Sequence, residues 1–151
     1  MRTPLAVALL LVALAHQHQA VAQQPPAPLE YIGKSVRGAP LSRAVKAGKL
    51  LFVSGTPGFD KTGKIAAGDF TAQMNQVMES ITATLKASGA GWDRVAKVNV
   101  MLVRASDFGE MNRIYSGYFP DGNYPARTTV VVSALPSPDF LLEIECAALL
   151  E

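Results

Sequence analysis

The segment YPARTTVVV, residues 124–132, places one arginine at the start of an otherwise apolar, β-branched run. Pro125 has no backbone N–H and disfavours a helix at this point, whereas Thr and Val favour a strand. Side chains alternate between the two faces of a strand, so Arg127, Thr129 and Val131 are expected to share one face. The segment therefore predicts a strand with a single cation near its first residue.

The end of the chain is expected to form another strand over residues 140–150, with Glu143 and Glu145 on one face. Arg127 near such carboxylates fits either a structural ion pair or a site for a small anion. An exposed ion pair stabilises a protein little, whereas a planar guanidinium can bind a carboxylate ligand through two hydrogen bonds. The two glutamates fit a solvated strand face or an acid/base pair. The ion pair and the solvated face are the more common outcomes of such spacing, and spacing alone leaves the alternatives open.

The first 22 residues have the features of a secretory signal peptide. Arg2 supplies a positive start, residues 5–15 are apolar, and Ala20-Val21-Ala22 matches a cleavage site before Gln23. The apolar run is shorter than the roughly 20 residues that a membrane-spanning helix needs. We expect cleavage near Ala22 and a secreted or periplasmic protein that is not attached to a membrane.

Cleavage would remove His16 and His18, the two histidines of the chain, and leave Cys146 as its one thiol. An intramolecular disulfide would then be impossible. A Ser-His-Asp triad, a Cys-His pair and ordinary zinc sites within one chain would be excluded as well. We therefore expect no metal and no cofactor, and any catalysis must use arginine, lysine, carboxylates, hydroxyls, backbone dipoles or water. Cys146 is expected to be a small core residue.

The formal net charge is +2, and lysine and arginine are scattered along the chain. Nucleic acid is not an expected partner, because phosphate binding needs a basic stripe. About 129 residues remain after cleavage, a length typical of one domain with its own core. Residues 23–38 are interpreted as a proline-rich leader and residues 39–151 as the domain.

A hairpin is expected near the start of the domain, with residues 41–47 and 50–55 joined by a turn at Gly48-Lys49. Residues 29–32 could add a short edge strand. Residues 56–68 are rich in Gly, Pro and Asp and predict a loop.

Two helices are expected after this loop. The first begins after Asp69, a candidate N-cap, and ends at Gly89. Its apolar residues recur at helical spacing and predict a buried stripe: Phe70, Met74, Val77, Met78, Ile81 and Leu85. The second is expected to begin at Ser106 as N-cap, to end near Phe119, and to bury Phe108, Met111, Ile114 or Tyr115, and Tyr118.

With strands over residues 95–103, 126–132 and 140–150, the element order becomes β-β-α-β-α-β-β, an α+β sheet with both helices on one face. If Val98, Val100 and Leu102 face the helices, the opposite face is left partly apolar. Its expected members are Met101 and Val103, joined, depending on register, by Val131, Leu141, Ala147 and Leu149. Such an exposed patch usually marks an interface, so we expect a closed homo-oligomer that buries it.

Short motifs along residues 39–150 resemble the RidA/YjgF family of reactive-intermediate (enamine/imine) deaminases. They are LFVSG (51–55), SG (88–89) before VAKV (95–98), DF (107–108) with MN (111–112) and Tyr115, YPAR (124–127), LP (135–136) and EIE (143–145). Each motif is short, but their order and spacing together are specific.

The resemblance implies a chorismate-mutase-like fold and a homotrimer with ligand clefts between subunits. It also implies hydrolysis of 2-imino acids or enamines to 2-keto acids and ammonia. In that role Arg127 would bind the carboxylate of this small substrate, and Glu143 would position or activate the attacking water. Ser54, Gly55 and Asn112 would line or support the cleft.

Two positions depart from the best-known members of the family. Leu41 stands where they have a cleft tyrosine, and Thr129 stands where they have a cysteine. If the cysteine acts through its main chain, Thr129 can serve as a substrate-binding residue. Leu41 removes a hydroxyl from the cleft and leaves the identity of the substrate open.

A non-catalytic ligand-binding or chaperone-like protein on the same fold is the main alternative, and a chorismate mutase is a further one. Ribonuclease activity has little support from the residues, because the chain expected after cleavage lacks histidine and a basic stripe.

Overall fold

The computed structural model describes residues 27–34 and 38–151. The expected signal peptide and residues 23–26 and 35–37 of the proline-rich leader lie outside the described residues. The strands are β1 (Glu30–Lys34), β2 (Ser42–Ala47), β3 (Leu50–Pro57), β4 (Val95–Leu102), β5 (Ala126–Val131) and β6 (Leu142–Leu149), and the α-helices are α1 (Phe70–Ala87) and α2 (Phe108–Ser116).

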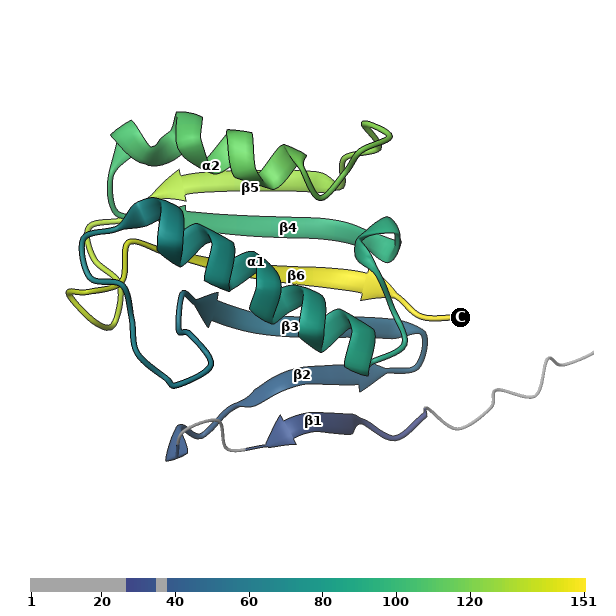
Figure 1. Cartoon of the computed structure of the whole chain (residues 1–151). Coiled ribbons are helices and arrows are strands. Elements are labelled where there is room, and N and C mark those ends of the chain that lie inside the picture. The colour runs from purple at the N-terminus through teal and green to yellow at the C-terminus, as the bar shows by residue number, and fades with distance from the viewer. Residues whose placement is uncertain (1–26, 35–37) are drawn as a thin grey trace, which may run out of the picture.

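All these strands belong to one mixed sheet in the order β1-β2-β3-β6-β4-β5. Strand β6 is antiparallel to both of its neighbours, whereas β5 is parallel to β4 and is reached through the crossover helix α2. Both helices cover the same face of the sheet, α1 over the central strands and α2 beside β5 (Figure 1). The expected α+β class, chorismate-mutase-like element order and one-sided helices are confirmed.

The N-terminal hairpin is also confirmed. Strands β2 and β3 pair around Gly48, whose φ of 60° lies in the left-handed region that glycine tolerates best. Strand β1 lies at the expected edge position and pairs with β2. Strand β3 runs further than expected, to Pro57, and has a register shift between Val53 and Thr56.

Helix α1 has the expected N-cap and buried stripe. The Asp69 carboxylate accepts a hydrogen bond from the backbone N–H of Ala72 at 2.9 Å. Every apolar position predicted for the stripe is buried against the sheet. In the described part of the chain, no helix combines the length and the apolar character needed to cross a membrane.

The start of α2 differs from the prediction. Residues 105–107 form a 3₁₀ turn, so that Asp107 rather than Ser106 occupies the N-cap position, without a side-chain capping bond. Phe108 was expected in the core but is 46% exposed. The 3₁₀ turn places this residue at the very first helical position, and the buried face of α2 is formed further along by Met111, Ile114 and Tyr115.

The sheet face without helices is partly apolar, as expected. Strand pairing puts on this face Leu50 and Phe52 of β3, Met101 of β4, and Ala147 and Leu149 of β6. We call this set the open-face patch.

Three residues assigned to that face from the sequence do not belong to it. Val131 pairs with Leu102 in parallel register and lies on the helix side. Leu141 precedes β6 and is buried, and Val103 packs against the core. The helix-side position of Val98, Val100 and Leu102 is confirmed, because all three are fully buried.

Candidate functional site

Arg127 lies on the edge strand β5 and points to the helix side of the sheet, because it pairs with the buried Val98. Its Nη2 donates a hydrogen bond to Oδ1 of Asn112 at 2.7 Å. The guanidinium lies over the ring of Tyr115, 4.8 Å from the ring centroid, and Nη1 approaches Sδ of Met111 at 3.7 Å. Three residues of α2 therefore hold this guanidinium.

The spacing within α2 explains this support. Residues three and four apart in a helix lie on the same side, so Met111, Asn112 and Tyr115 can all face β5. The sequence had suggested Asn112 as a cleft residue, and the structure brings it to Arg127. The role of Tyr115 beneath Arg127 was missed, although its helical spacing from Met111 was a usable signal.

A cavity of about 480 Å³ opens at this place. It is lined by Asn112, Tyr115, Ser116, Tyr124, Pro125 and Arg127. None of these is acidic, and in the described part of the chain Arg127 forms no ion pair. The cavity thus combines a free cation with aromatic walls and has a size usual for small-molecule sites.

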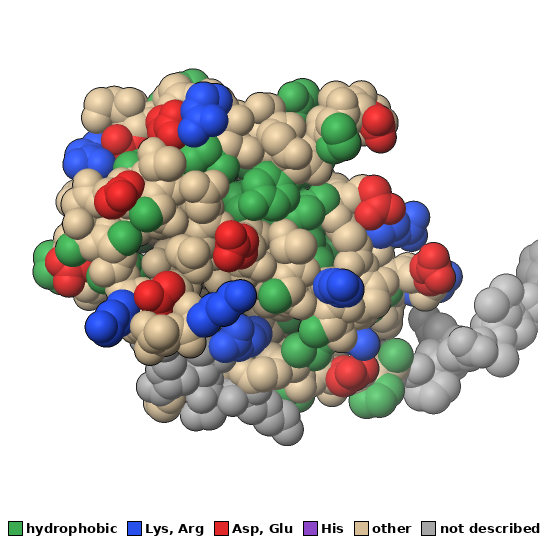
Figure 2. Space-filling model, viewed as in Figure 1, with side chains coloured by type: hydrophobic (Ala, Val, Ile, Leu, Met, Phe, Trp, Pro, Cys, Tyr) green, Lys and Arg blue, Asp and Glu red, His purple; other side chains and the backbone are tan. Residues whose placement is uncertain are grey.

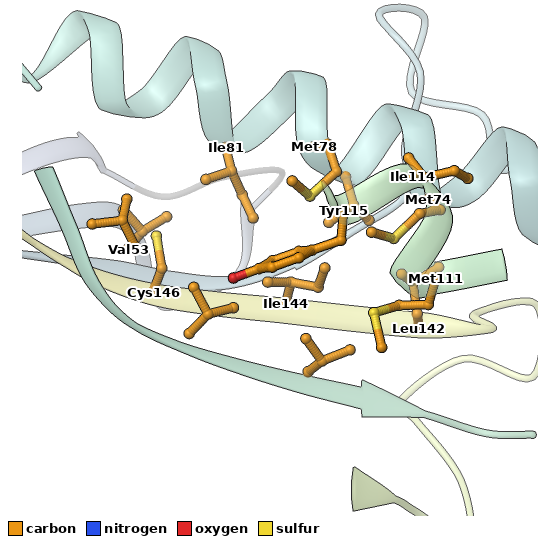
Figure 3. Close-up of a cluster of buried hydrophobic side chains, with 14 of the residues drawn as sticks. Val53, Met74, Met78, Ile81, Met111, Ile114, Tyr115, Leu142, Ile144 and Cys146 are labelled. Atoms are coloured by element: carbon orange, nitrogen blue, oxygen red, sulfur yellow. The ribbon is translucent and has the colours of Figure 1, made fainter. Parts of the chain in front are cut away.

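Tyr115 forms a buried and uncharged wall of this cavity. Its ring lies in the core between Met78 and Ile81 of α1 and Ile144 of β6 (Figure 3). Burial raises the pKa of its hydroxyl to about 12. Neither this hydroxyl nor Oγ1 of Thr129 has a hydrogen-bond partner among the described residues. Thr129 shares the helix-side face with Arg127, as predicted.

Glu143 lies on β6 beside Pro57 of β3 and Met101 of β4. Its carboxyl group fills the space in front of Gly55, where an added Cβ would overlap Oε1 and lie 2.8 Å from Cδ. Burial raises the pKa of Glu143, and the neighbouring charge of Glu145 raises it further. The Glu143 carboxylate can occupy this place only because residue 55 is a glycine. Any side chain at residue 55 would displace the carboxylate.

Glu145 has a different environment, because Nδ2 of Asn99 donates a hydrogen bond to it at 2.7 Å. The carboxylate of Glu143 makes no hydrogen bond or ion pair within residues 27–34 and 38–151. The two glutamates share a strand face, as predicted, but only Glu143 lacks a hydrogen-bond partner among the described residues.

Ser54 and Gly55 line a second cavity, of about 420 Å³, between α1 and the strands β2 and β3. The Ser54 hydroxyl donates to the backbone oxygen of Ser42 at 2.7 Å and so ties β3 to β2. Leu41 also lines this cavity and is 45% exposed. Leu41, one of the two residues that depart from the family pattern, thus lies in the same cavity as Ser54 and Gly55.

Arg127 and Glu143 lie on opposite faces of the sheet. Glu143 pairs with Met101 on the face without helices, whereas Arg127 pairs with Val98 on the helix side. An ion pair between Arg127 and the glutamates of the same chain, the more common outcome of the spacing, is therefore wrong. The structure forms two groups, Arg127 with Asn112 and Thr129, and Glu143 with Gly55. Ser54 shares the second cavity with Gly55.

Cys146 is buried in the core, as predicted, and burial raises the pKa of its thiol to about 12. Such a thiol remains protonated at neutral pH and is a poor nucleophile. Within the described ranges, no three His, Cys, Asp or Glu side chains gather as metal ligands do.

Charges on the helix-covered face are mixed. Figure 2 shows blue Lys and Arg side chains interspersed with red Asp and Glu side chains on this face. No continuous basic stripe of the kind that binds a nucleic-acid backbone is present there.

Comparison with known proteins agrees with this fold. The sequence model of the family described as Endoribonuclease L-PSP matches residues 34–150. A RutC family protein of Pyrococcus horikoshii is 46% identical over 110 residues, which cover 72% of this chain and 86% of the relative. Reactive Intermediate Deaminase A, a chloroplastic protein of Arabidopsis thaliana, is 43% identical over 112 residues, 74% of this chain and 59% of the relative.

A solved structure shows that the fold is similar as well as the sequence. The crystal structure of E. coli TdcF with bound serine superposes with a TM-score of 0.70 at 31% sequence identity, covering 75% of this chain and 90% of TdcF. The family match over residues 34–150, together with the shared arrangement of sheet and helices, shows that this chain belongs to the RidA/YjgF family.

Proposed function

We propose that this protein hydrolyses reactive 2-imino acids or enamines to 2-keto acids and ammonia, with Arg127 binding the substrate carboxylate. The observation that carries the proposal is the guanidinium of Arg127, held by Asn112 and Tyr115 at a cavity wall and without an ion-pair partner in the described residues. The deaminase name of the Arabidopsis relative supports the reaction class. The serine bound to E. coli TdcF resembles a 2-imino acid in having a carboxylate next to a nitrogen-bearing carbon 2.

The chemistry needs no histidine. A protonated imine is electrophilic at carbon 2, so hydrolysis requires an oriented water and a weak base. The water oxygen bonds to carbon 2 while the C=N electrons move to nitrogen, and Glu143 accepts a proton from the water. Glu143 then returns this proton to the nitrogen. Ammonia leaves as the hydroxyl oxygen forms the C=O bond, and the hydroxyl proton passes to Glu143. The raised pKa of Glu143 makes it a stronger base than an ordinary glutamate.

In this proposal the active cleft is shared between subunits, because Arg127 and Glu143 of one chain lie on opposite sheet faces. In the proposed homotrimer, Arg127 of one subunit would face Gly55 and Glu143 of the next. The open-face patch, with Phe52 49% exposed, supports self-association because exposed apolar surface of this kind favours an interface.

The test is hydrolysis of 2-iminopropanoate or 2-iminobutanoate, generated in a coupled assay and measured above the spontaneous rate. Arg127→Ala should abolish the activity while the oligomer stays intact. Arg127→Lys keeps the charge but loses two-point binding, so KM should rise by about 10- to 100-fold. Arg104→Ala is a control, because Arg104 pairs with Asp107 on the surface. Full activity of Arg127→Ala would contradict the proposal.

A non-catalytic ligand-binding protein on the same fold is the second candidate. Leu41 favours it, because an apolar side chain lines the cavity of Ser54 and Gly55 where a hydroxyl was expected. This candidate predicts binding of 2-imino acid analogues without any acceleration of imine hydrolysis. RNA cleavage, which the description of the family model suggests, has no histidine to use within residues 27–34 and 38–151.

We also propose that the protein is exported, on the strength of the signal-peptide pattern in residues 1–22. Sequencing the N-terminus of protein recovered from the periplasm or medium should give Gln23 as the first residue. An intact Met1 on protein confined to the cytoplasm would contradict export.

A further inference from the structure

Gln73 is the one long polar side chain among the fully buried residues of α1. Burying an amide costs free energy unless its donors and acceptor are all used. Here they are: Nε2 donates to the backbone oxygens of Ala66 at 2.9 Å and Asp139 at 2.8 Å, and Oε1 accepts from the backbone N–H of Leu141 at 3.0 Å.

These three hydrogen bonds join segments that are far apart in sequence. Ala66 belongs to the loop that follows β3, whereas Asp139 and Leu141 lie in the segment that leads into β6. Leu141 directly precedes β6 and lies two residues before Glu143. Its hydrogen bond to Gln73 therefore holds the start of β6 in place.

The backbone of Gln73 also contacts Gly58, which directly follows β3. Gly58 packs so closely against α1 that a Cβ there would lie 2.7 Å from Cα and from the backbone oxygen of Gln73. Gly58 is three residues after Gly55, whose missing side chain leaves room for the Glu143 carboxylate. One residue of α1 therefore contacts both the end of β3 and the approach to β6.

We propose that Gln73 is a positioning residue for Glu143, holding the ends of β3 and β6 in the register that sets the carboxylate beside Gly55. The inference rests on the proposed function, because it assigns Gln73 a part in turnover through Glu143. An apolar residue at position 73 would still fill the buried face of α1, but it could not bind the three backbone groups.

The test is a double-mutant cycle with Gln73→Met, which keeps the length and flexibility of the side chain and removes its hydrogen bonds. In the otherwise unchanged protein, kcat for imine hydrolysis should fall by about 10- to 100-fold through misplacement of Glu143. KM should change little, because Arg127 lies in the other group of residues. In the Glu143→Gln background, Gln73→Met should change kcat by less than about 2-fold.

Ser88→Ala is the matched control on the same helix. Ser88 is buried and its Oγ donates to the backbone oxygen of Thr84, but it touches neither strand end of the site. This variant should lose stability and keep the kcat of the unchanged protein.

The outcomes separate the inference from the function on which it rests. If Glu143→Gln alone leaves kcat unchanged, the proposed role of Glu143 fails. If Glu143→Gln lowers kcat but Gln73→Met has no effect, or the same fold effect in both backgrounds, the positioning role is overturned. Should Gln73→Met not fold, the cycle is repeated with Gln73→Glu, which retains the acceptor for Leu141. Failure of both variants to fold would assign Gln73 to the fold alone and overturn the proposal.

Discussion

A guanidinium that stacks on an aromatic ring keeps its N–H groups available to acceptors in its own plane. The ring of Tyr115 supplies that surface for Arg127, and Asn112 occupies one nitrogen. The pKa of Tyr115, about 12, keeps its hydroxyl uncharged at neutral pH. Arg127 is thus held in place before a ligand arrives, which reduces the conformational entropy lost on binding.

At Gly55, a single methyl group should lower turnover without unfolding the protein. The Cβ of Gly55→Ala would overlap the Glu143 carboxylate, which can move aside because it ends a flexible side chain. Turnover should approach that of Glu143→Gln, while the free energy of unfolding should change by less than about 1 kcal/mol.

Imine-hydrolysis kinetics and urea unfolding check the two parts of this prediction. Gly109→Ala is its control, since a Cβ there meets nothing within 4 Å. That variant should keep its turnover and gain up to about 1 kcal/mol in stability. Unchanged turnover in Gly55→Ala would show that the position of the Glu143 carboxylate is not critical.

Glu143 should make both activity and stability depend on pH. Its pKa in the folded protein lies above the ordinary value of 4.5, because burial and Glu145 disfavour the charged form. Between the two values the native state binds the proton more strongly than the unfolded chain, so the free energy of unfolding rises as pH falls through this window. Turnover should fall over the same window, because the base becomes protonated.

The matched variant is Glu143→Gln. It should remove this part of the pH dependence, raise the free energy of unfolding at pH 7 and lower turnover more than binding. Denaturant titrations at several pH values measure the stability effect. A variant less stable than the unchanged protein at pH 7 would argue that Glu143 makes a favourable charged interaction.

At the scale of elements, the two helices begin in different ways. The Asp69 side chain caps α1 through the N–H of Ala72, whereas Asp107 at the start of α2 makes no capping bond and pairs with Arg104 on the surface. Helix α1 carries Gln73 and a large part of the core. A well-formed first turn of α1 should therefore support both the position of Gln73 and the stability of the protein.

Asp69→Ala should therefore cost about 1 kcal/mol of unfolding free energy, the usual effect of losing an N-cap. Asp107→Ala should cost less, about 0.5 kcal/mol, because it removes only a partly exposed ion pair. The midpoints of urea unfolding for the two variants measure the difference. Equal losses would show that the hydrogen bond of Asp69 to Ala72 adds nothing specific.

At the scale of the whole molecule, the open-face patch is an apolar surface that nothing in this chain covers among the described residues. The other face is covered by both helices, while Leu50, Phe52 and Leu149 remain exposed beside the polar Asn99 and Glu145. In the proposed trimer, a second copy of the chain would bury this surface and would also bring its own Arg127 group toward Gly55 and Glu143.

Phe52→Lys should accordingly dissociate the proposed trimer and abolish imine hydrolysis. Phe108→Lys is a matched control, because Phe108 is similarly exposed but lies on α2, away from the open face. Sedimentation velocity at micromolar concentration distinguishes the species. An unchanged protein that sediments as a monomer, or a Phe52→Lys variant that remains trimeric, would contradict the assembly.

The sequence predicted most helices, strands and strand faces of this protein, because these features depend on residues that are close in sequence. Alternation put Arg127 with Thr129, and Glu143 with Glu145, each pair on one face of its own strand. Helical spacing predicted the stripe of α1, and Asp69 predicted its first turn. The start of α2 was missed because a 3₁₀ turn and a helix satisfy nearly the same sequence pattern at Ser106 and Asp107.

Only the tertiary structure decided how these local faces are combined. Alternation fixes which residues of one strand share a face, but the face of Arg127 relative to that of Glu143 depends on strand order and register, which are set by contacts distant in sequence. The same holds for the burial of Gln73 and for the approach of Gly55 to Glu143. The sequence determined the residues of the two groups, and packing placed them on opposite faces of one sheet.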